Sequence, residues 1–352
     1  MATLTELGGW PAVLSALIDR RDLTADEAQA ALTDVLAGEA APAQIAAFIV
    51  ALRMKGETVA EVTGMVDAML AAASPLELPA GLEPIDIVGT GGSPARRRAA
   101  LNISTGACFI AAGAGATVLK HGNRRASSTS GSFDVLEALG VAIELDGPGV
   151  ARCVAEAGIG FCFARAFHPA MRHAGPVRAE LGVPSVFNVL GPLSHPARVT
   201  RQVIGVTDPG LAPMVLGVLQ ARGAARAMVV TGSDGLDELT ITGPSTVHEL
   251  RDGTVRTAEI DPASLGVATA SAEELHGGDP ETNAAIVRGV LAGEGGPATE
   301  VMVLNAAAGL VVAGVVDGLG AGVEAARAAI SSGGAAAALE RLVEVSAATA
   351  AG

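Results

Sequence analysis

Short apolar runs that alternate with helical stretches dominate the chain after residue 84. These runs lie at residues 85–88, 116–119, 160–164, 203–206 and 227–230. Strands that alternate with helices are typical of βαβ units and a largely parallel sheet. Half of the residues are apolar and only 2% are aromatic, a composition that favours helices and parallel sheets over β-sandwiches. We therefore predict an α/β fold with a mainly parallel central sheet.

The N-terminal part of the chain shows a helical pattern instead. Thr24 and Thr58 each precede a glutamate by three positions, Glu27 and Glu61 respectively. This spacing fits the capping box, in which a hydroxyl and a carboxylate bind the free N–H groups at a helix start. Apolar residues then recur at helical spacing, for example within residues 45–52, so this part is predicted to contain helices only.

A turn-rich link at residues 74–84, SPLELPAGLEP, separates the two patterns. Residues 168–182, HPAMRHAGPVRAELG, return to a helical and more polar character. We predict a small N-terminal helical domain at residues 1–75, with residues 168–185 packing on it. Residues 76–352 are expected to form the larger α/β domain.

The stretch from residue 87 to residue 133 contains no Asp or Glu, although the whole chain has a formal net charge of -14. Its cationic residues are Arg96, Arg97, Arg98, Lys120, Arg124 and Arg125. Glycine-rich loops, helix N-termini and point charges bind phosphate oxygens, so this stretch predicts a site for a small polyanion. The low pI, about 4.8, argues against nucleic acid as a partner, because affinity for a duplex comes from Lys and Arg.

The three cysteines, Cys108, Cys153 and Cys162, form no CxxC pair and indicate buried thiols in a reducing compartment. The N-terminus has no basic segment followed by an apolar core, so no signal peptide is expected. The longest apolar runs, at residues 106–119 and 306–316, are shorter than the roughly 20 residues that cross a bilayer. We expect a cytoplasmic protein without a membrane partner.

Two loops that follow predicted strands carry the residues expected to bind phosphate. Gly89-Thr90-Gly91-Gly92 follows the first strand, and Lys120-His121-Gly122-Asn123 follows the second. Ligands of parallel sheets bind at the carboxyl ends of the strands, so both loops should lie at one edge. Each motif alone also fits an ordinary turn. Neither is a GxGxxG or Walker sequence, so dinucleotide and nucleoside triphosphate binding gain no support.

Other motifs also allow two interpretations. Asn102-Ile103-Ser104-Thr105 precedes an apolar run and is typical of plain helix capping, or of a helix N-terminus that binds phosphate. Asp237-Glu238, within SDGLDELTITGP, is either a solvated acidic turn or a pair of oxygen ligands for Mg²⁺ on substrate phosphates. Arg178 either forms a surface salt bridge or binds a carboxylate in a bidentate manner. His168 and His173 lack the context of a zinc site.

In this order and spacing, four blocks resemble the anthranilate phosphoribosyltransferase family. They are residues 86–92 (DIVGTGG), 102–140 (NIST to LEALG), 167–193 (FHPAMRHAGPVRAELGVPSVFNVLGPL) and 234–244 (DGLDELTITGP). The resemblance implies a homodimer of subunits that have a small helical and a larger α/β domain, like the pyrimidine nucleoside phosphorylases. It also implies a Mg²⁺-dependent step of tryptophan biosynthesis. In this reaction the 5-phosphoribosyl group of 5-phosphoribosyl 1-diphosphate (PRPP) passes to the amine of anthranilate, and pyrophosphate is released.

The resemblance also implies roles for individual residues. PRPP would be bound by Gly89, Gly91, Gly92, Ser93, Asn102, Ser104, Thr105, Lys120, Asn123, Ser128 and Ser132. Anthranilate would be bound by Gly89, Asn123, His168 and Arg178. Two Mg²⁺ ions per subunit would be held by Ser104, Asp237 and Glu238. No classical acid or base is expected, and Lys120, Asp237 and Glu238 would act electrostatically, because an aromatic amine is already an uncharged nucleophile.

The loop after the first strand departs from the family. The family usually has GTGGDG and a Thr two residues before the Asn of NIST, whereas this chain has Ser93 and Ala100 there and a loop about three residues longer. The Arg96–Arg98 run could supply the missing charge compensation. A paralogue that acts on another aromatic acceptor in secondary metabolism therefore stays an alternative, as does a non-catalytic binding paralogue. A nucleoside phosphorylase would share the glycine loop and the lysine but would have no use for the block at residues 168–182.

Overall fold

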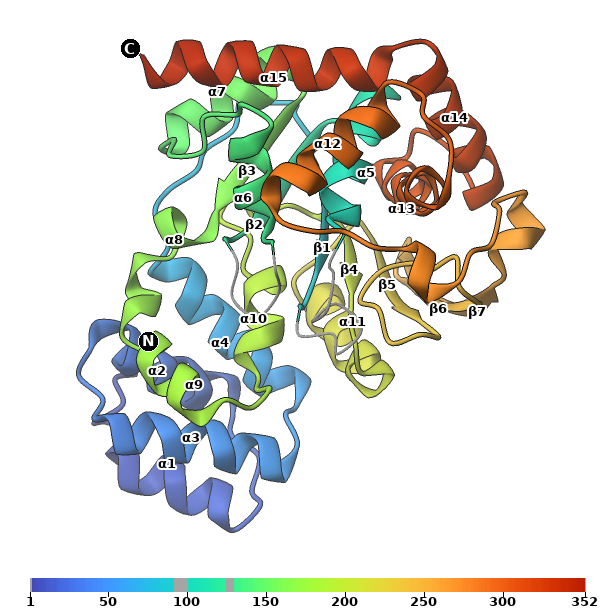
Figure 1. The fold of residues 1–352 in the computed structure, drawn as a ribbon. Helices are drawn as coiled ribbons and strands as arrows, with labels where there is room; N and C mark the ends of the chain where they lie inside the picture. The colour runs from blue at the N-terminus through green and yellow to red at the C-terminus, as the bar shows by residue number, and fades with distance from the viewer. Residues whose placement is uncertain (1, 92–100, 125–129, 352) are drawn as a thin grey trace. The chain divides into compact units, whose positions relative to one another are not determined.

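The computed structural model of this protein describes residues 2–91, 101–124 and 130–351. The chain forms two compact units (Figure 1). The helical unit comprises Met1–Pro75, Arg165–Arg198 and Pro213–Gly223, and the sheet unit comprises Leu76–Ala164, Val199–Ala212 and Ala224–Gly352.

This division differs from a single cut after residue 75. Residues 168–185 belong to the helical unit, but so do residues 186–198 and 213–223, which we predicted to be part of the α/β domain. The physical reason is helix packing within that unit. For example, a Cβ atom on Gly217 would lie 2.6 Å from the side chain of Val59, so the two helices that carry these residues touch closely.

The helical unit is built from short helices, as predicted for the N-terminal part. They are α1 (Gly9–Ile18), α2 (Ala25–Ala37), α3 (Pro42–Lys55), α4 (Val59–Ala71), α8 (Ala164–Phe167), η2 (Pro169–Arg172), α9 (Gly175–Leu181), α10 (Phe187–Leu193) and α11 (Ala212–Ala221). Both predicted capping boxes are confirmed. The Thr24 hydroxyl accepts from the Glu27 N–H while the Thr24 N–H donates to the Glu27 carboxylate, and Thr58 and Glu61 repeat the arrangement.

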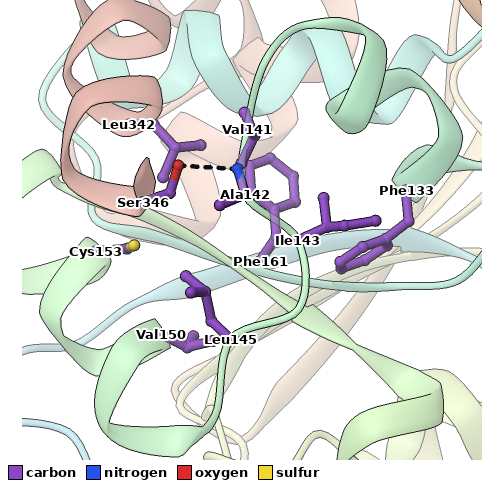
Figure 2. A pocket seen from close by; sticks show the side chains of 10 residues that line it. All are labelled: Phe133, Val141, Ala142, Ile143, Leu145, Val150, Cys153, Phe161, Leu342 and Ser346. Atoms are coloured by element: carbon purple, nitrogen blue, oxygen red, sulfur yellow. Dashed lines mark hydrogen bonds between the residues drawn. The ribbon is translucent and has the colours of Figure 1, made fainter. Parts of the chain in front are cut away.

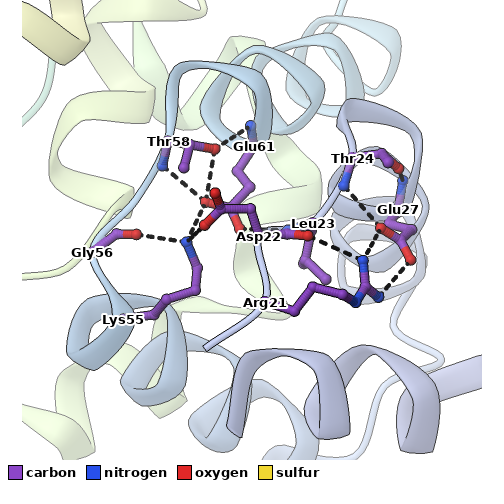
Figure 3. A network of polar contacts seen from close by, with 9 residues as sticks. All are labelled: Arg21, Asp22, Leu23, Thr24, Glu27, Lys55, Gly56, Thr58 and Glu61. Atoms are coloured by element: carbon purple, nitrogen blue, oxygen red, sulfur yellow. Dashed lines mark hydrogen bonds and ion pairs between the residues drawn. The ribbon is translucent and has the colours of Figure 1, made fainter. Parts of the chain in front are cut away.

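Glu61 does more than cap α4, because its carboxylate is buried in a polar network (Figure 3). It accepts hydrogen bonds from the Leu23 N–H at 2.9 Å and from the Lys55 ammonium at 3.0 Å. Lys55 also pairs with Asp22 at 2.7 Å. The network therefore ties the loop before α2, the end of α3 and the start of α4 together.

We expect Glu61→Gln to lower the free energy of unfolding by about 3 kcal/mol, since removing the buried partner of an ion pair is strongly destabilising and leaves the Lys55 ammonium only the exposed Asp22 as a partner. Urea unfolding followed by circular dichroism measures the change. Glu39→Gln, at an exposed position, is the control and should change stability by less than about 0.5 kcal/mol. Equal stability of the two variants would show that the network contributes nothing.

The sheet unit has a seven-stranded sheet in the order β3-β2-β1-β4-β5-β6-β7. The strands are β1 (Ile85–Gly89), β2 (Val118–Gly122), β3 (Ile159–Phe163), β4 (Arg201–Gly205), β5 (Arg226–Gly232), β6 (Ser245–Arg251) and β7 (Thr254–Ile260). The first five are parallel to one another and match the predicted apolar runs, so the predicted α/β fold with a mainly parallel sheet is confirmed. β6 and β7 add an antiparallel hairpin that the apolar runs did not indicate.

Helices of the sheet unit bury one face of the sheet (Figure 1). They are α5 (Ile103–Gly113), α6 (Ser132–Ala138), α7 (Gly147–Ala157), α12 (Pro280–Leu291), α13 (Pro297–Ala313), α14 (Leu319–Ser331) and α15 (Gly334–Ala350), with 3-10 turns η3 (Pro209–Leu211), η4 (Pro262–Leu265) and η5 (Ala272–Glu274). Gly309 lets α13 approach β1, because a Cβ atom there would lie 2.5 Å from the Ile87 side chain. The C-terminal Ala- and Gly-rich segment is thus packed helix.

The predicted burial of the three thiols is confirmed. Burial raises the pKa of Cys108 to about 12 and that of Cys153 to about 11, so both are protonated near neutrality. Cys153 lies in an apolar pocket where the Ala142 N–H donates to the Ser346 hydroxyl (Figure 2). That pocket is core packing and offers no reactive group. Within the described ranges no helix has both the length and the apolar character needed to cross a membrane.

Candidate active site

The sheet reverses its strand order at β1, and the predicted glycine loop begins there. β2 and β3 lie on one side of β1, whereas β4 and β5 lie on the other. In α/β sheets such a switch point opens a crevice at the carboxyl ends of the strands. Gly89 ends β1 opposite Gly205 of β4, and the next residue, Thr90, donates its N–H to the Gly205 carbonyl at 2.9 Å. Because β2 runs parallel to β1, its carboxyl end lies at the same edge, as predicted. Lys120, His121 and Gly122 are themselves residues of β2, however, so the predicted loop at Lys120–Asn123 begins only at Asn123.

Asp237 is brought to this edge from the loop between β5 and β6. Its Oδ2 accepts a hydrogen bond from the Gly91 N–H at 2.7 Å. A Cβ atom on Gly89 would lie 2.1 Å from the same oxygen, and one on Gly205 would lie 1.7 Å from the Asp237 carbonyl oxygen. Both positions therefore require glycine if Asp237 is to approach the loop. An ordinary turn would not require glycine at both positions.

We expect Gly205→Ala to lower kcat/KM at least about 100-fold, because the displaced backbone of Asp237 moves its carboxylate, and misplacement by about 1 Å has effects of this size. Steady-state kinetics and the thermal midpoint measure the effect. Gly320→Ala is the matched control, since no atom lies within 4 Å of a Cβ at Gly320. A Gly205→Ala enzyme as active as the control would show that the close approach is dispensable.

Glu238 faces the N-terminus of α5. Its Oε1 accepts from the Ser104 N–H at 3.0 Å. Asn102 is the N-cap residue of that helix and does not cap it with its side chain. The Thr105 hydroxyl is buried and has no hydrogen-bond partner among the described residues. The predicted NIST motif thus places the N-terminus of α5 beside the Glu238 carboxylate.

Buried hydrogen bonds hold the Asp237-Glu238 segment in shape. Asp234 accepts from the hydroxyls of Thr240 and Thr242 at 2.7 and 2.9 Å. Asn305, on α13, accepts from the Leu239 N–H at 3.0 Å and donates to the Leu239 carbonyl at 2.8 Å. Asp237 and Glu238 are only 1% and 3% exposed. The interpretation of this pair as a solvated acidic turn is therefore wrong.

Lys120 lies in the buried part of β2. Its ammonium donates to the Ile87 carbonyl of β1 at 2.6 Å. The carboxylate of Asp86, also on β1, accepts from the His121 N–H at 3.2 Å. Burial raises the pKa of Asp86 to about 7, and the charge of Lys120 opposes that rise. We did not predict Asp86 as a site residue from the sequence. A carboxylate within an otherwise apolar strand is nevertheless unusual and could have indicated it.

The structure describes only part of the remaining donor segment. The Ser132 hydroxyl donates to the Asn123 carbonyl at 3.2 Å, so these two predicted residues lie together. Arg124 forms ion pairs with Asp134 at 3.2 Å and with Glu137 at 2.8 Å, and these acidic residues lie just outside the cationic stretch and offset its charge. The predicted residues Gly92, Ser93 and Ser128, and the run Arg96–Arg98, lie outside the described residues.

Two of the four residues predicted to bind the acceptor, His168 and Arg178, belong to the helical unit. Arg178, on α9, is half-buried, and its guanidinium carbon lies 5.1 Å from the centre of the Phe187 ring. Burial lowers its pKa. No carboxylate pairs with it in the described part of the chain, so the surface salt bridge considered for it is absent there.

His168 and His173 have different surroundings in the helical unit. His168 is buried, and burial lowers its pKa to about 4, so the ring is neutral near pH 7. The ring of His173 packs against Gly38, where a Cβ atom would lie 2.7 Å from it. Among the described residues no group of three His, Cys, Asp or Glu side chains could hold a metal ion. A site of the zinc type is thus not found in that part of the chain.

The acidic pair fits a different kind of metal. Mg²⁺ is typically bound by one or two carboxylates together with substrate phosphates. The Glu238 carboxylate lies beside Ser104, and the Asp237 carboxylate lies beside the glycine loop. These are oxygen donors, placed where backbone N–H groups also favour phosphate. The residues present therefore fit Mg²⁺ that is bridged to a phosphorylated substrate.

Comparisons with known proteins place both parts of the chain in one family. Residues 82–336 match the a/b domain of a glycosyl transferase family, and residues 11–73 match the helical bundle domain of that family. The chain is 54% identical over 340 residues to the anthranilate phosphoribosyltransferase of Arthrobacter sp. (strain FB24), covering 95% of both chains. It is 51% identical over 342 residues to that of Rhodococcus jostii (strain RHA1), covering 96% of this chain and 93% of the other.

Solved structures of anthranilate phosphoribosyltransferases also superpose on nearly the whole chain. The crystal structure of anthranilate phosphoribosyltransferase from Thermus thermophilus superposes with a TM-score of 0.89 at 42% identity, covering 95% of this chain and 99% of the other. The enzyme from Saccharomyces cerevisiae, in complex with PRPP and Mg, superposes with a TM-score of 0.87 at 26% identity, covering 96% and 98%.

Proposed function

Since the chain belongs to the anthranilate phosphoribosyltransferase family, we propose that the site at the ends of β1 and β4 carries the reaction of that family. The enzyme transfers the 5-phosphoribosyl group from PRPP to the amine of anthranilate, in tryptophan biosynthesis, and releases pyrophosphate. The observation that carries the proposal is the placement of the Asp237 and Glu238 carboxylates against the glycine loop and the N-terminus of α5.

The donor is held by the sheet unit. The loop at Gly89–Gly91 has no side chain bulkier than that of Thr90, so it would let the pyrophosphate approach the backbone closely, and Asn102, Ser104 and Thr105 would offer the N-terminus of α5 to phosphate oxygens. The PRPP-binding residues inferred from the family also include Gly92, Ser93, Asn123, Ser128 and Ser132. Lys120 supplies a fixed positive charge from within the sheet. Binding by backbone donors and fixed charges positions the donor without reorganisation at the moment of reaction.

Ser104, Asp237 and Glu238 would hold two Mg²⁺ ions per subunit. Bound Mg²⁺ neutralises the negative charge that develops on the leaving pyrophosphate. The yeast relative in complex with PRPP and Mg supports Mg²⁺ as the metal. The loop at residues 93–101 differs from the family, so we assign no metal ligand there.

The acceptor is held by its carboxylate and left free at its amine. Arg178 has a guanidinium without a carboxylate partner in the described residues, and Arg binds carboxylates in a bidentate manner. His168 is neutral near pH 7, so it can line the acceptor site without adding charge. Gly89 and Asn123 complete the acceptor set. The aromatic amine needs no strong base, because it is uncharged at neutral pH.

Pyrophosphate release from PRPP and Mg²⁺, with a panel of aromatic acceptors, tests this function. We expect saturable turnover with anthranilate and no phosphorolysis of pyrimidine nucleosides. If only another aromatic carboxylate is turned over, the enzyme is a paralogue with a different acceptor. If none of the tested acceptors is turned over, the non-catalytic alternative is supported.

We also propose that the enzyme is a homodimer in the cytoplasm. Ile18 on α1 and Met54 on α3 are 73% and 70% exposed, and both belong to the helical unit. Contiguous exposed apolar patches mark protein–protein interfaces, and we assign these two side chains to such a patch. Analytical ultracentrifugation of Ile18→Asp with Met54→Asp should show monomers where the wild type shows dimers.

A further inference from the structure

Asn283 lies at the start of α12, distant in sequence from the motifs that define the site. It is completely buried. Its Nδ2 donates to the Oδ1 of Asn102 at 2.7 Å, across 181 positions of sequence. Its Oδ1 accepts from the Gly278 N–H at 2.8 Å. Because a backbone N–H can only donate, the Asn283 amide must turn its oxygen towards Gly278 and its Nδ2 towards Asn102.

This fixed orientation decides how Asn102 presents its own amide. The Asn102 Oδ1 is engaged by a donor, so its Nδ2 is the atom left for a ligand. The Asn102 Oδ1 accepts no capping hydrogen bond from α5 either. If the amide were flipped, it would turn Oδ1 towards the ligand, and an oxygen facing a phosphate oxygen would be repulsive rather than attractive.

We propose that Asn283 is a positioning residue for donor binding, which holds the Asn102 amide so that its Nδ2 donates to a PRPP phosphate. The inference rests on the proposed function, since it requires Asn102 to bind the donor. Asn283 needs no contact with the substrate. Its effect is expected on the affinity for PRPP and not on the affinity for anthranilate.

The test is a double-mutant cycle on the dissociation constant of PRPP, measured by titration calorimetry with saturating Mg²⁺. N283D keeps the oxygen for Gly278 and loses the donor to Asn102, and Asn283→Ala removes the amide without adding charge. A hydrogen bond to a charged group has a typical strength that corresponds to about 10- to 100-fold in affinity. We expect N283D, Asn283→Ala and Asn102→Ala each to weaken PRPP binding by that factor.

The PRPP affinity of the double variant decides whether Asn283 acts through Asn102. If Asn283 acts through Asn102, N283D combined with Asn102→Ala should bind PRPP no more weakly than Asn102→Ala alone. Thr282→Asp adds a charge at the neighbouring exposed position, and should leave the affinity within about twofold. Thermal midpoints verify that each variant is folded.

Each other outcome contradicts a defined claim. If the effects of N283D and Asn102→Ala multiply in the double variant, or if both Asn283 variants bind PRPP like the wild type, the positioning role is wrong and the proposed function stands. If Asn102→Ala itself leaves PRPP binding unchanged, both the donor role of Asn102 and the positioning role are overturned.

Discussion

Asp237→Asn combined with Glu238→Gln is expected to lower kcat/KM at least about 1,000-fold while the enzyme stays folded. Removing one preorganised electrostatic group from an active site typically lowers kcat by about 100- to 1,000-fold, and this variant removes two carboxylates. Neutral amides bind Mg²⁺ poorly but keep an oxygen that can accept from the N–H groups of Gly91 and Ser104, which donate to the carboxylates at 2.7 and 3.0 Å. The fold therefore retains its hydrogen bonds and loses its metal ligands.

Steady-state kinetics over a range of Mg²⁺ concentrations, together with circular dichroism, measures this effect. Asp317→Asn removes a carboxylate that is exposed and pairs only with Arg251 among the described residues, so it serves as the control and should leave kcat/KM unchanged. Alanine at positions 237 and 238 should also abolish turnover. Undiminished turnover in the amide variant would refute the metal assignment.

Arg178→Ala is expected to raise the KM for anthranilate by about 30- to 100-fold, the range of a charge-assisted hydrogen bond. The KM for PRPP should change by less than about twofold, because Arg178 belongs to the acceptor set. Arg178→Lys keeps the charge but loses the planar fork, so we expect it to restore only part of the affinity.

Arg172→Ala is the matched control, since Arg172 lies exposed in the neighbouring turn η2. It should leave both KM values unchanged. Equal increases of both KM values in Arg178→Ala would show instead that this arginine acts through its packing on Phe187, 5.1 Å away.

Much of the fold could be predicted from local sequence patterns. The five parallel strands are buried apolar runs, and the capping boxes mark the starts of α2 and α4. β7 is almost entirely exposed and therefore has no apolar run. The return of α10 and α11 to the helical unit depends on packing between segments distant in sequence, which local periodicity does not encode.

The candidate site shows the same limit. The motifs at β1, β2 and α5 could be found because each is a short cluster that follows or starts a predicted element. Gly205, Asn283 and Asn305 could not, because each is a single residue whose role appears only when a distant segment meets it. Asn305, for example, is hydrogen-bonded to the backbone of Leu239, which lies 66 positions away in the sequence. Nothing local distinguishes it from other polar residues of an apolar helix.

Anomalous diffraction from crystals grown with PRPP and Mn²⁺ in place of Mg²⁺ locates the metal ions. We expect metal peaks within coordination distance of the carboxylates of Asp237 and Glu238, with PRPP phosphates completing the coordination and the donor bound at the loop Gly89–Gly91 and the N-terminus of α5. Metal and donor bound elsewhere, with both carboxylates still hydrogen-bonded only to protein, would contradict it.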